Sequence, residues 1–155
     1  MVVTEKLFAR CYPFRVAAAL SGASPKAIRN WIDRGQISLD ADESRPDGKN
    51  RLYSAFDIIR LAIARPLADF SWPVEGAWII AMGVFVGRAA INFEKTNLSP
   101  EEVADRLSGR TIYAWRTGSS ADFRYGQLPS DAPAAVLTVD VARIAREVLE
   151  AIEKT

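Results

Sequence analysis

SPKAIRNWIDRG, residues 24–35, is the stretch that decides the fold expected for this chain. Ser24 is a favourable N-cap, because its hydroxyl can accept a hydrogen bond from a free backbone N–H at the start of a helix. Pro25 follows at the first helical position, where its missing N–H has no cost. Gly35 is well suited to end the helix. The segment is therefore predicted to form one short helix.

The predicted helix has two different faces. Three apolar residues recur at helical spacing and form the face expected to be buried: Ile28, Trp31 and Ile32. The opposite face is polar and carries Lys26, Arg29, Asn30 and Asp33. Lysine, arginine and asparagine side chains can reach phosphates and base edges from a helix in the major groove. The pattern favours a DNA-reading helix.

A second helix is predicted immediately before this one. Residues 14–20, FRVAAAL, have a compact helical pattern, and residues 21–24, SGAS, indicate a turn. Two helices joined by a short glycine-containing turn are typical of a helix-turn-helix.

The residues after Gly35 predict a β-hairpin wing. Gln36–Leu39 can form a short strand, residues 40–50 are a polar loop with a Pro-Asp-Gly turn signal, and Arg51–Tyr53 can return as a second strand. Lys49, Arg51 and Tyr53 would then suit phosphate contacts beside the groove. The alternative is a solvated loop, since four acidic residues also lie in this stretch.

Together these motifs resemble the MerR-type winged helix-turn-helix regulators. The resemblance covers roughly residues 14–67 and rests on ALSGASPKAIRNWIDRGQI at 19–37 and GKNRLYSAFDIIRL at 48–61. Asn30 stands where an aromatic residue is usual, and Gln36 where leucine is usual. The resemblance implies that DNA is contacted by Ser24, Lys26, Arg29, Asn30, Lys49, Arg51 and Tyr53. It also implies a homodimer on near-palindromic promoter DNA.

Ser54 and Asp57 predict the start of a further helix, and Pro66 predicts its end or a kink near Arg65. Residues 71–73, Ser-Trp-Pro, then divide the chain into an expected DNA-binding domain, 1–71, and a C-terminal region, 72–155. The latter is assigned to dimerisation, effector binding or partner docking.

Residues 74–93 read as a helix that is apolar nearly all round, and such a helix must be covered. Three alternatives are open: the core of the domain, a dimer interface, or a ligand pocket lined by Trp78, Met82 and Phe85.

The remaining C-terminal residues predict a small α+β region. Its expected elements are a helix from Ser99 to about Leu107, strands at Thr111–Arg116, Phe123–Leu128 and Ala135–Val139, and a final helix capped by Asp140. The expected fold class is mainly α with short β-hairpins: a MerR-like winged helix-turn-helix followed by this region.

Charge and composition restrict the function. Residues 1–70 carry 11 Lys and Arg against 8 Asp and Glu, and residues 71–155 carry 9 against 11, so the basic excess lies with the helix-turn-helix. The chain has no histidine and one cysteine, which removes the commonest metal ligand and Cys/His or Ser/His nucleophile pairs. We therefore expect no enzyme, no catalytic residue, no metal and no cofactor.

The same features predict the cellular setting. Residues 1–10 are too polar and too short for a signal peptide, and the longest apolar run is too short to span a bilayer. A single cysteine suits a reducing compartment. The expected location is the cytoplasm, with no membrane partner.

The first functional hypothesis is a sequence-specific, double-stranded DNA-binding transcriptional regulator that acts as a homodimer, with RNA polymerase as a further partner. The alternative is an excisionase-like or phage DNA-packaging-type adaptor, whose C-terminal half docks a phage or recombination protein.

Overall fold

Helix α4, Ala55–Asp69, is the central helix of the computed structural model, which describes residues 7–39, 51–86 and 98–155. Ten of its residues are buried, and it contacts α2, α5 and α7. Its start is a capping box, as predicted: Ser54 Oγ accepts from the Asp57 N–H at 3.0 Å, and the Asp57 carboxylate accepts from the Ser54 N–H at 3.2 Å. The predicted end near Arg65 is wrong, because the helix continues through Pro66 to Asp69.

The two helices of the N-terminal unit are present at the expected residues. Helix α2 spans Phe14–Ser21, α3 spans Pro25–Asp33, and residues 22–24 join them. Ser24 Oγ accepts from the Ala27 N–H at 3.1 Å, which confirms the predicted N-cap. At the other end, the Gly35 N–H donates to the Ile32 carbonyl and the next N–H to that of Trp31. This pair of bonds closes the helix.

The predicted wing strand at Gln36–Leu39 is wrong. No strand forms there, and the side chains of Ile37 and Leu39 are buried in the core instead. Strand β2, Leu52–Tyr53, pairs antiparallel with β1, Tyr12–Pro13, which lies immediately before α2. The loop predicted at residues 40–50 lies outside the described residues.

Helix α5, Val74–Gly83, is shorter than the predicted helix of residues 74–93. The chain leaves the helix at Val84, and residues 87–93 lie outside the described residues. Tyr125 lies at this end, where its hydroxyl donates to the Ile80 carbonyl at 2.6 Å. Burial raises the pKa of Tyr125.

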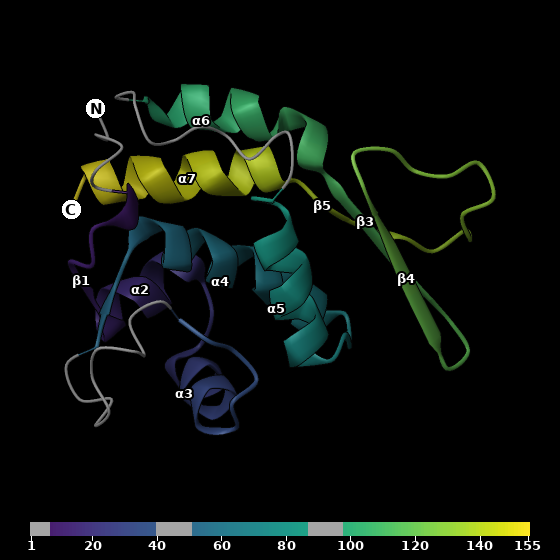
Figure 1. The fold of residues 1–155 in the computed structure, drawn as a ribbon, viewed down its shortest axis with the longest axis horizontal. Coiled ribbons are helices and arrows are strands. Elements are labelled where there is room, and N and C mark those ends of the chain that lie inside the picture. Colours follow the sequence, from purple (N-terminus) through teal and green to yellow (C-terminus); the bar gives the residue numbers. More distant parts are fainter. Residues whose placement is uncertain (1–6, 40–50, 87–97) are drawn as a thin grey trace.

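Two helices of the C-terminal half lie side by side, α6 (Pro100–Leu107) and α7 (Val141–Glu153), and α7 also packs on α4 (Figure 1). Both begin as the sequence predicted. Ser99 and Glu102 form a capping box, and Asp140 accepts from the Arg143 N–H at 3.0 Å. A short 3₁₀ turn, η2 (Ser108–Arg110), follows α6.

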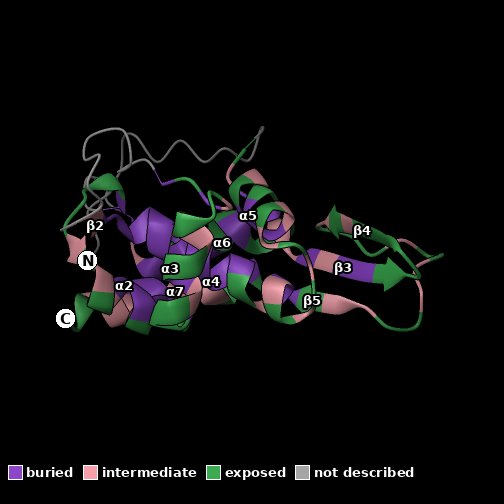
Figure 2. Cartoon of the chain, turned by 90° about the horizontal axis from the view of Figure 1, so that it is seen from below, coloured by how far each residue is buried: buried purple, intermediate pink, exposed green. Residues whose placement is uncertain are grey.

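Three antiparallel strands form in the described part of the C-terminal half, in the order β4-β3-β5, but the strand predicted at Phe123–Leu128 is misplaced, because it begins at Ser120 and ends at Tyr125. The strands are β3 (Ile112–Thr117), β4 (Ser120–Tyr125) and β5 (Leu137–Val139). In the hairpin, Thr117 pairs with Ser120, so the turn is two residues long. Figures 1 and 2 show the β3–β4 hairpin extending away from the helices, with β4 mostly exposed and β3 more buried.

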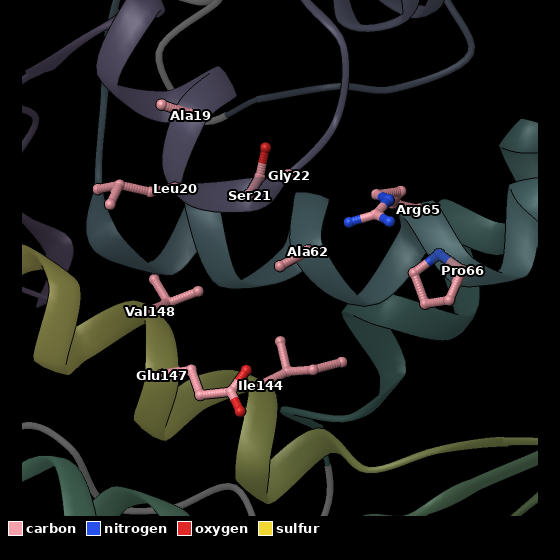
Figure 3. A pocket seen from close by; sticks show the side chains of 10 residues that line it. All are labelled: Ala19, Leu20, Ser21, Gly22, Ala62, Arg65, Pro66, Ile144, Glu147 and Val148. Atoms are coloured by element: carbon pink, nitrogen blue, oxygen red, sulfur yellow. The ribbon is translucent and has the colours of Figure 1, made fainter.

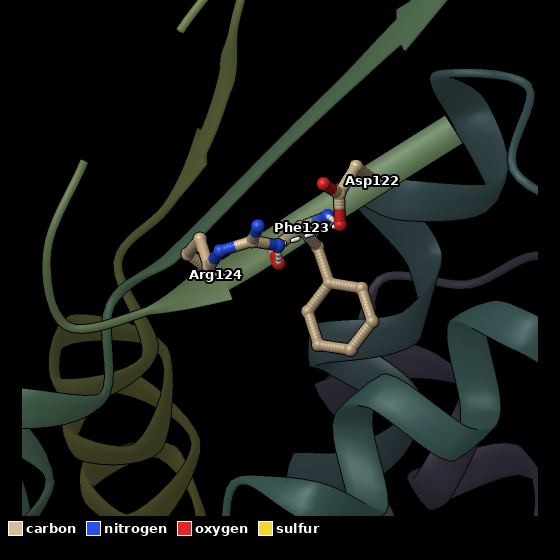
Figure 4. A network of polar contacts seen from close by, with 3 residues as sticks. All are labelled: Asp122, Phe123 and Arg124. Carbon is tan, nitrogen blue, oxygen red and sulfur yellow. Dashed lines mark hydrogen bonds and ion pairs between the residues drawn. The ribbon is translucent and has the colours of Figure 1, made fainter. Parts of the chain in front are cut away.

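A local polar network lies on the exposed face of β4 (Figure 4). The carboxylate of Asp122 accepts from Arg124 Nη1 at 2.6 Å and from the Phe123 N–H at 2.8 Å, and these two contacts lower the pKa of that carboxyl. Arg124 also donates to the Phe123 carbonyl. The ring of Phe123 contacts Trp72 edge-on at a centroid distance of 6.0 Å. The hairpin is thus anchored to the start of α5.

The buried core includes residues from both halves of the chain. Ile28 of α3, Leu67 of α4, Trp78 of α5 and Leu149 of α7 belong to one cluster. The fold combines helices with short antiparallel sheets, in agreement with the predicted mainly α class. The division at residues 71 and 72 stays a prediction.

Candidate nucleic-acid interface

Helix α3 presents a continuous polar face. Lys26, Arg29 and Asn30 are all exposed, and their i, i+3, i+4 spacing places them on the same side of the helix. Ile28 faces the opposite way and is fully buried, with an exposed fraction of 0%. The buried Ile28 fixes which side of α3 faces outward, so the three predicted contact residues are available together.

Only part of the predicted apolar face is deeply buried. Trp31 and Ile32 are partly exposed, although both pack against the core. Ile28 therefore anchors α3 in the core, whereas Trp31 and Ile32 lie at the edge of the contact between α3 and the core.

Arg29 is held between the two helices of the unit. Its guanidinium carbon lies 4.8 Å from the centroid of the Phe14 ring, at the start of α2. Arginine over an aromatic face is attracted by the ring quadrupole while its N–H groups stay available at the rim. Phe14 in turn lies against Tyr53, with ring centroids 6.2 Å apart. The Arg29 guanidinium thus lies on the outer ring of a pair of tilted aromatic side chains.

Tyr53 does not lie where a phosphate contact requires it. Its side chain is only 1% exposed, so it is a core residue, and the prediction that it contacts DNA is wrong. The cause is the pairing of β2 with β1, in which Tyr53 lies opposite Tyr12 and its carbonyl accepts from the Cys11 N–H at 3.2 Å. Arg51, two residues earlier, is partly exposed. Lys49 lies outside the described residues.

Arg34 is a basic residue that the sequence interpretation omitted. It is exposed at the C-cap of α3, four positions after Asn30, and so extends the same face. The helical spacing from Asn30 could have identified it. Asp33 is also exposed beside it, so the face is basic with one acidic residue at its end. Ser24 is exposed at the other end, where its hydroxyl oxygen already accepts from Ala27.

The proposed pocket of Trp78, Met82 and Phe85 is not formed as one lining. Trp78 is 3% exposed and packs in the core, whereas Met82 is 36% exposed on the surface. Phe85 packs on Phe56 at a centroid distance of 4.3 Å. Trp78 and Met82 lie four residues apart on one side of α5, but Met82 is in the last turn of the helix, which ends at Gly83, and is at the surface there. A cavity that the structure does contain lies elsewhere, between α2, α4 and α7 (Figure 3).

Within residues 7–39, 51–86 and 98–155, no group of three or more Cys, Asp or Glu residues is placed to hold a metal ion. No helix in this part of the chain has the length and apolarity needed to cross a membrane.

Comparison with known proteins leaves the MerR resemblance as a hypothesis drawn from the residues. No protein-family model matches the chain, and no curated protein matches it significantly.

Proposed function

We propose that the chain is a sequence-specific, double-stranded DNA-binding transcriptional regulator. The observation that carries this proposal is the polar face of α3, on which Lys26, Arg29 and Asn30 are exposed together. Lysine, arginine and asparagine can all donate hydrogen bonds to phosphates and to base edges in a major groove. A nine-residue helix that is anchored by one buried isoleucine and joined to α2 by residues 22–24 is suited to such a groove.

The proposal assigns different tasks to different residues. Arg29, Lys26 and Asn30 lie on the helix that would enter the groove, where base edges are within reach. Arg51 lies at the edge of β2, outside that helix, and is assigned a phosphate contact, which fixes position without reading sequence. Because Tyr53 is buried, Arg51 would contact the phosphate without help from Tyr53.

We expect Arg29→Ala and Arg51→Ala to weaken DNA binding in different ways. If Arg29 reads a base, Arg29→Ala should cost about 1–3 kcal/mol on the selected sequence and relax preference at one position per half-site. Arg51→Ala removes a cation that would bind a phosphate, so it should weaken selected and scrambled duplexes equally and lower the salt slope by roughly one unit per subunit. The measurement is titration at several salt concentrations, after selection of a binding sequence from random duplexes.

Arg106→Ala, on the exposed face of α6, is the control and should bind DNA as the unchanged chain does. If Arg29→Ala acted like Arg51→Ala, Arg29 would bind a phosphate and Lys26 or Asn30 would be the base reader. If neither variant changed DNA affinity, the DNA-binding proposal would fail.

The proposal includes a homodimer, and exposed apolar side chains support it. Ile79 is 61% exposed and Met82 36%, both on α5, and Val86 just after that helix is 64% exposed. Ile79 and Met82 are three residues apart and so lie on one side of α5, and contiguous exposed apolar patches mark protein contact surfaces. Sedimentation at micromolar concentration should give about twice the chain mass of 17.1 kDa.

We expect Ile79→Asp to shift the dimer toward monomer, because a carboxylate cannot be buried in an apolar contact without a partner. Leu128→Asp, at an exposed apolar residue after the hairpin, is the matched control and should stay dimeric. A natural chain that sediments as a monomer and binds DNA as a monomer would contradict the dimer.

The second candidate function is an excisionase-like or phage DNA-packaging-type adaptor. The projecting β3–β4 hairpin favours it, because β4 is an exposed edge strand on which another protein could add a strand. Both functions require DNA binding by α3. A footprint over a promoter spacer would favour the regulator, and a requirement for a recombinase or packaging partner would favour the adaptor.

A further inference from the structure

Strand β4 lies at the outer edge of its sheet and pairs with β3 on one side only (Figure 2). The Gly126 N–H, directly after β4, donates to the Thr111 carbonyl at 2.7 Å. Backbone groups of alternate residues in an antiparallel strand face the same neighbour, so the even-numbered residues of β4 face β3. The N–H and C=O groups of the odd-numbered residues therefore face the outer edge: Ala121, Phe123 and Tyr125.

At the middle of this edge, the two side chains next to Phe123 occupy its backbone groups (Figure 4). The Asp122 carboxylate accepts from the Phe123 N–H at 2.8 Å, and Arg124 Nη1 donates to the Phe123 carbonyl at 2.7 Å. Asp122 and Arg124 also pair with each other at 2.6 Å, and each side chain is about half exposed. Ion pairs this exposed are weak, so a second strand could replace these local contacts at small cost.

The charges on β4 are arranged symmetrically about Phe123, with Asp122 before it and Arg124 after it. When two identical strands pair antiparallel about a two-fold axis at Phe123, Asp122 of each copy faces Arg124 of the other. Phe123 faces its own copy, and its outward N–H and C=O bond to that copy. Asp122 and Arg124 then lie in the alternate pairs, in which opposed side chains are closest. The edge is thus complementary to itself in both hydrogen bonding and charge.

The aromatic side chains of β4 lie on a face of the sheet and not at its edge. Phe123 contacts Trp72 at a centroid distance of 6.0 Å, and the Tyr125 hydroxyl donates to the Ile80 carbonyl. Pairing through backbone groups leaves these contacts with α5 intact. The exposed Ile79 adjoins Ile80 in the chain, so the apolar surface assigned to the homodimer lies near the end of β4.

We propose that a second copy of this chain binds along β4, so that the two sheets join into one antiparallel sheet. The pairing is centred on Phe123 and exchanges the Asp122–Arg124 pair within each chain for two such pairs between the chains. Moving the centre to either neighbouring residue would place Asp122 opposite its own copy or Arg124 opposite its own copy, and like charges directly opposite are destabilising. The inference rests on the homodimer of the proposed function and names the strand that joins it.

The first experiment reverses one charge at a time. In the dimer, Asp122→Arg would place two pairs of arginines opposite each other, and Arg124→Asp two pairs of carboxylates. Each variant alone should dimerise about 10–100-fold more weakly than the natural chain, measured by sedimentation over a range of micromolar concentrations. An equimolar mixture of the two variants should regain nearly the natural affinity, because in the mixed dimer every reversed side chain faces the opposite charge.

Two further variants complete the comparison. The double variant, Asp122→Arg with Arg124→Asp, exchanges the two charges and should dimerise alone as the natural chain does. Asp131→Arg makes the same chemical change at an exposed residue after the hairpin and is the matched control, which should also dimerise as the natural chain does. Circular dichroism of each variant checks that the fold is kept.

The outcomes separate this inference from the proposed function. If either single variant dimerised with the natural affinity, β4 would not join the copies, and the homodimer would stand on the apolar surface of α5 alone. If the mixture stayed monomeric, the Asp122–Arg124 pair would act only within one chain, and the inference would be overturned. A natural chain that is a monomer would overturn both the inference and the homodimer and leave the edge to a strand of another protein. The DNA titrations with Arg29→Ala would still decide the DNA-binding proposal.

Discussion

Ile28→Ala is expected to lower the free energy of unfolding by about 2–5 kcal/mol, the range for isoleucine truncation in a core. Ile28 has an exposed fraction of 0% and is the one buried residue of α3. The substitution removes the side chain that anchors this helix and leaves a cavity beneath it. Urea denaturation followed by circular dichroism measures the change.

Ile32→Ala is the matched control, since it makes the same chemical change on the same helix. Ile32 is partly exposed, so its truncation removes less buried surface and should cost clearly less. If the two variants were equally destabilised, the orientation of α3 would differ from that described, and so would the outward face proposed for DNA.

Gly126→Ala is expected to destabilise the protein by about 2–5 kcal/mol, because it combines two costs. Gly126 has φ +82°, in the left-handed region that disfavours a side chain, and an added Cβ would lie 2.6 Å from the backbone oxygen of Gly109. Backbone cannot move aside as a flexible side chain can. The Gly126 N–H also donates to the Thr111 carbonyl at 2.7 Å, so the close approach is fixed by a hydrogen bond.

Two other glycines separate these costs. Gly118→Ala, at φ +59° with no atom within 4 Å, should show only the conformational cost, roughly 1–2 kcal/mol. Gly109→Ala, which also meets no atom and has no positive φ, should change stability by less than about 0.5 kcal/mol. Thermal unfolding of the three variants gives the comparison. Equal effects at Gly126 and Gly118 would show that η2 and the end of β4 do not pack as described.

The part of the candidate interface that lies on α3 was predictable, because the periodicity of the helix decides which of its side chains are exposed. Lys26, Arg29 and Asn30 are exposed on one face because the same helix buries Ile28 on the other, and both faces follow from 3.6 residues per turn. Arg34 was missed although its spacing from Asn30 gave the signal. The stacking of Arg29 on Phe14 had no such signal, because it depends on how α2 crosses α3.

Tyr53 shows the limit of the local pattern. Its neighbour Arg51 and the polar loop before it suggested a surface wing, but the strand pairs with Tyr12–Pro13 and buries the tyrosine. Both helices of the N-terminal unit lie between the two strands in the chain. The spacing of residues within residues 51–53 does not indicate which strand they pair with, since strand pairing is decided by which strand edges meet in the folded chain.

The sequence by itself determined the capped starts of four helices and the outward face of α3. Ser24, Ser54, Ser99 and Asp140 each cap the helix predicted from them, because a cap involves only a side chain and a backbone N–H three residues later. The tertiary structure decided the partner of β2, the burial of Tyr53 and the close contact of Tyr125 with the end of α5. It also placed Ala62, Arg65 and Glu147 around one cavity. These features join residues far apart in the chain, so they form only when the helices pack.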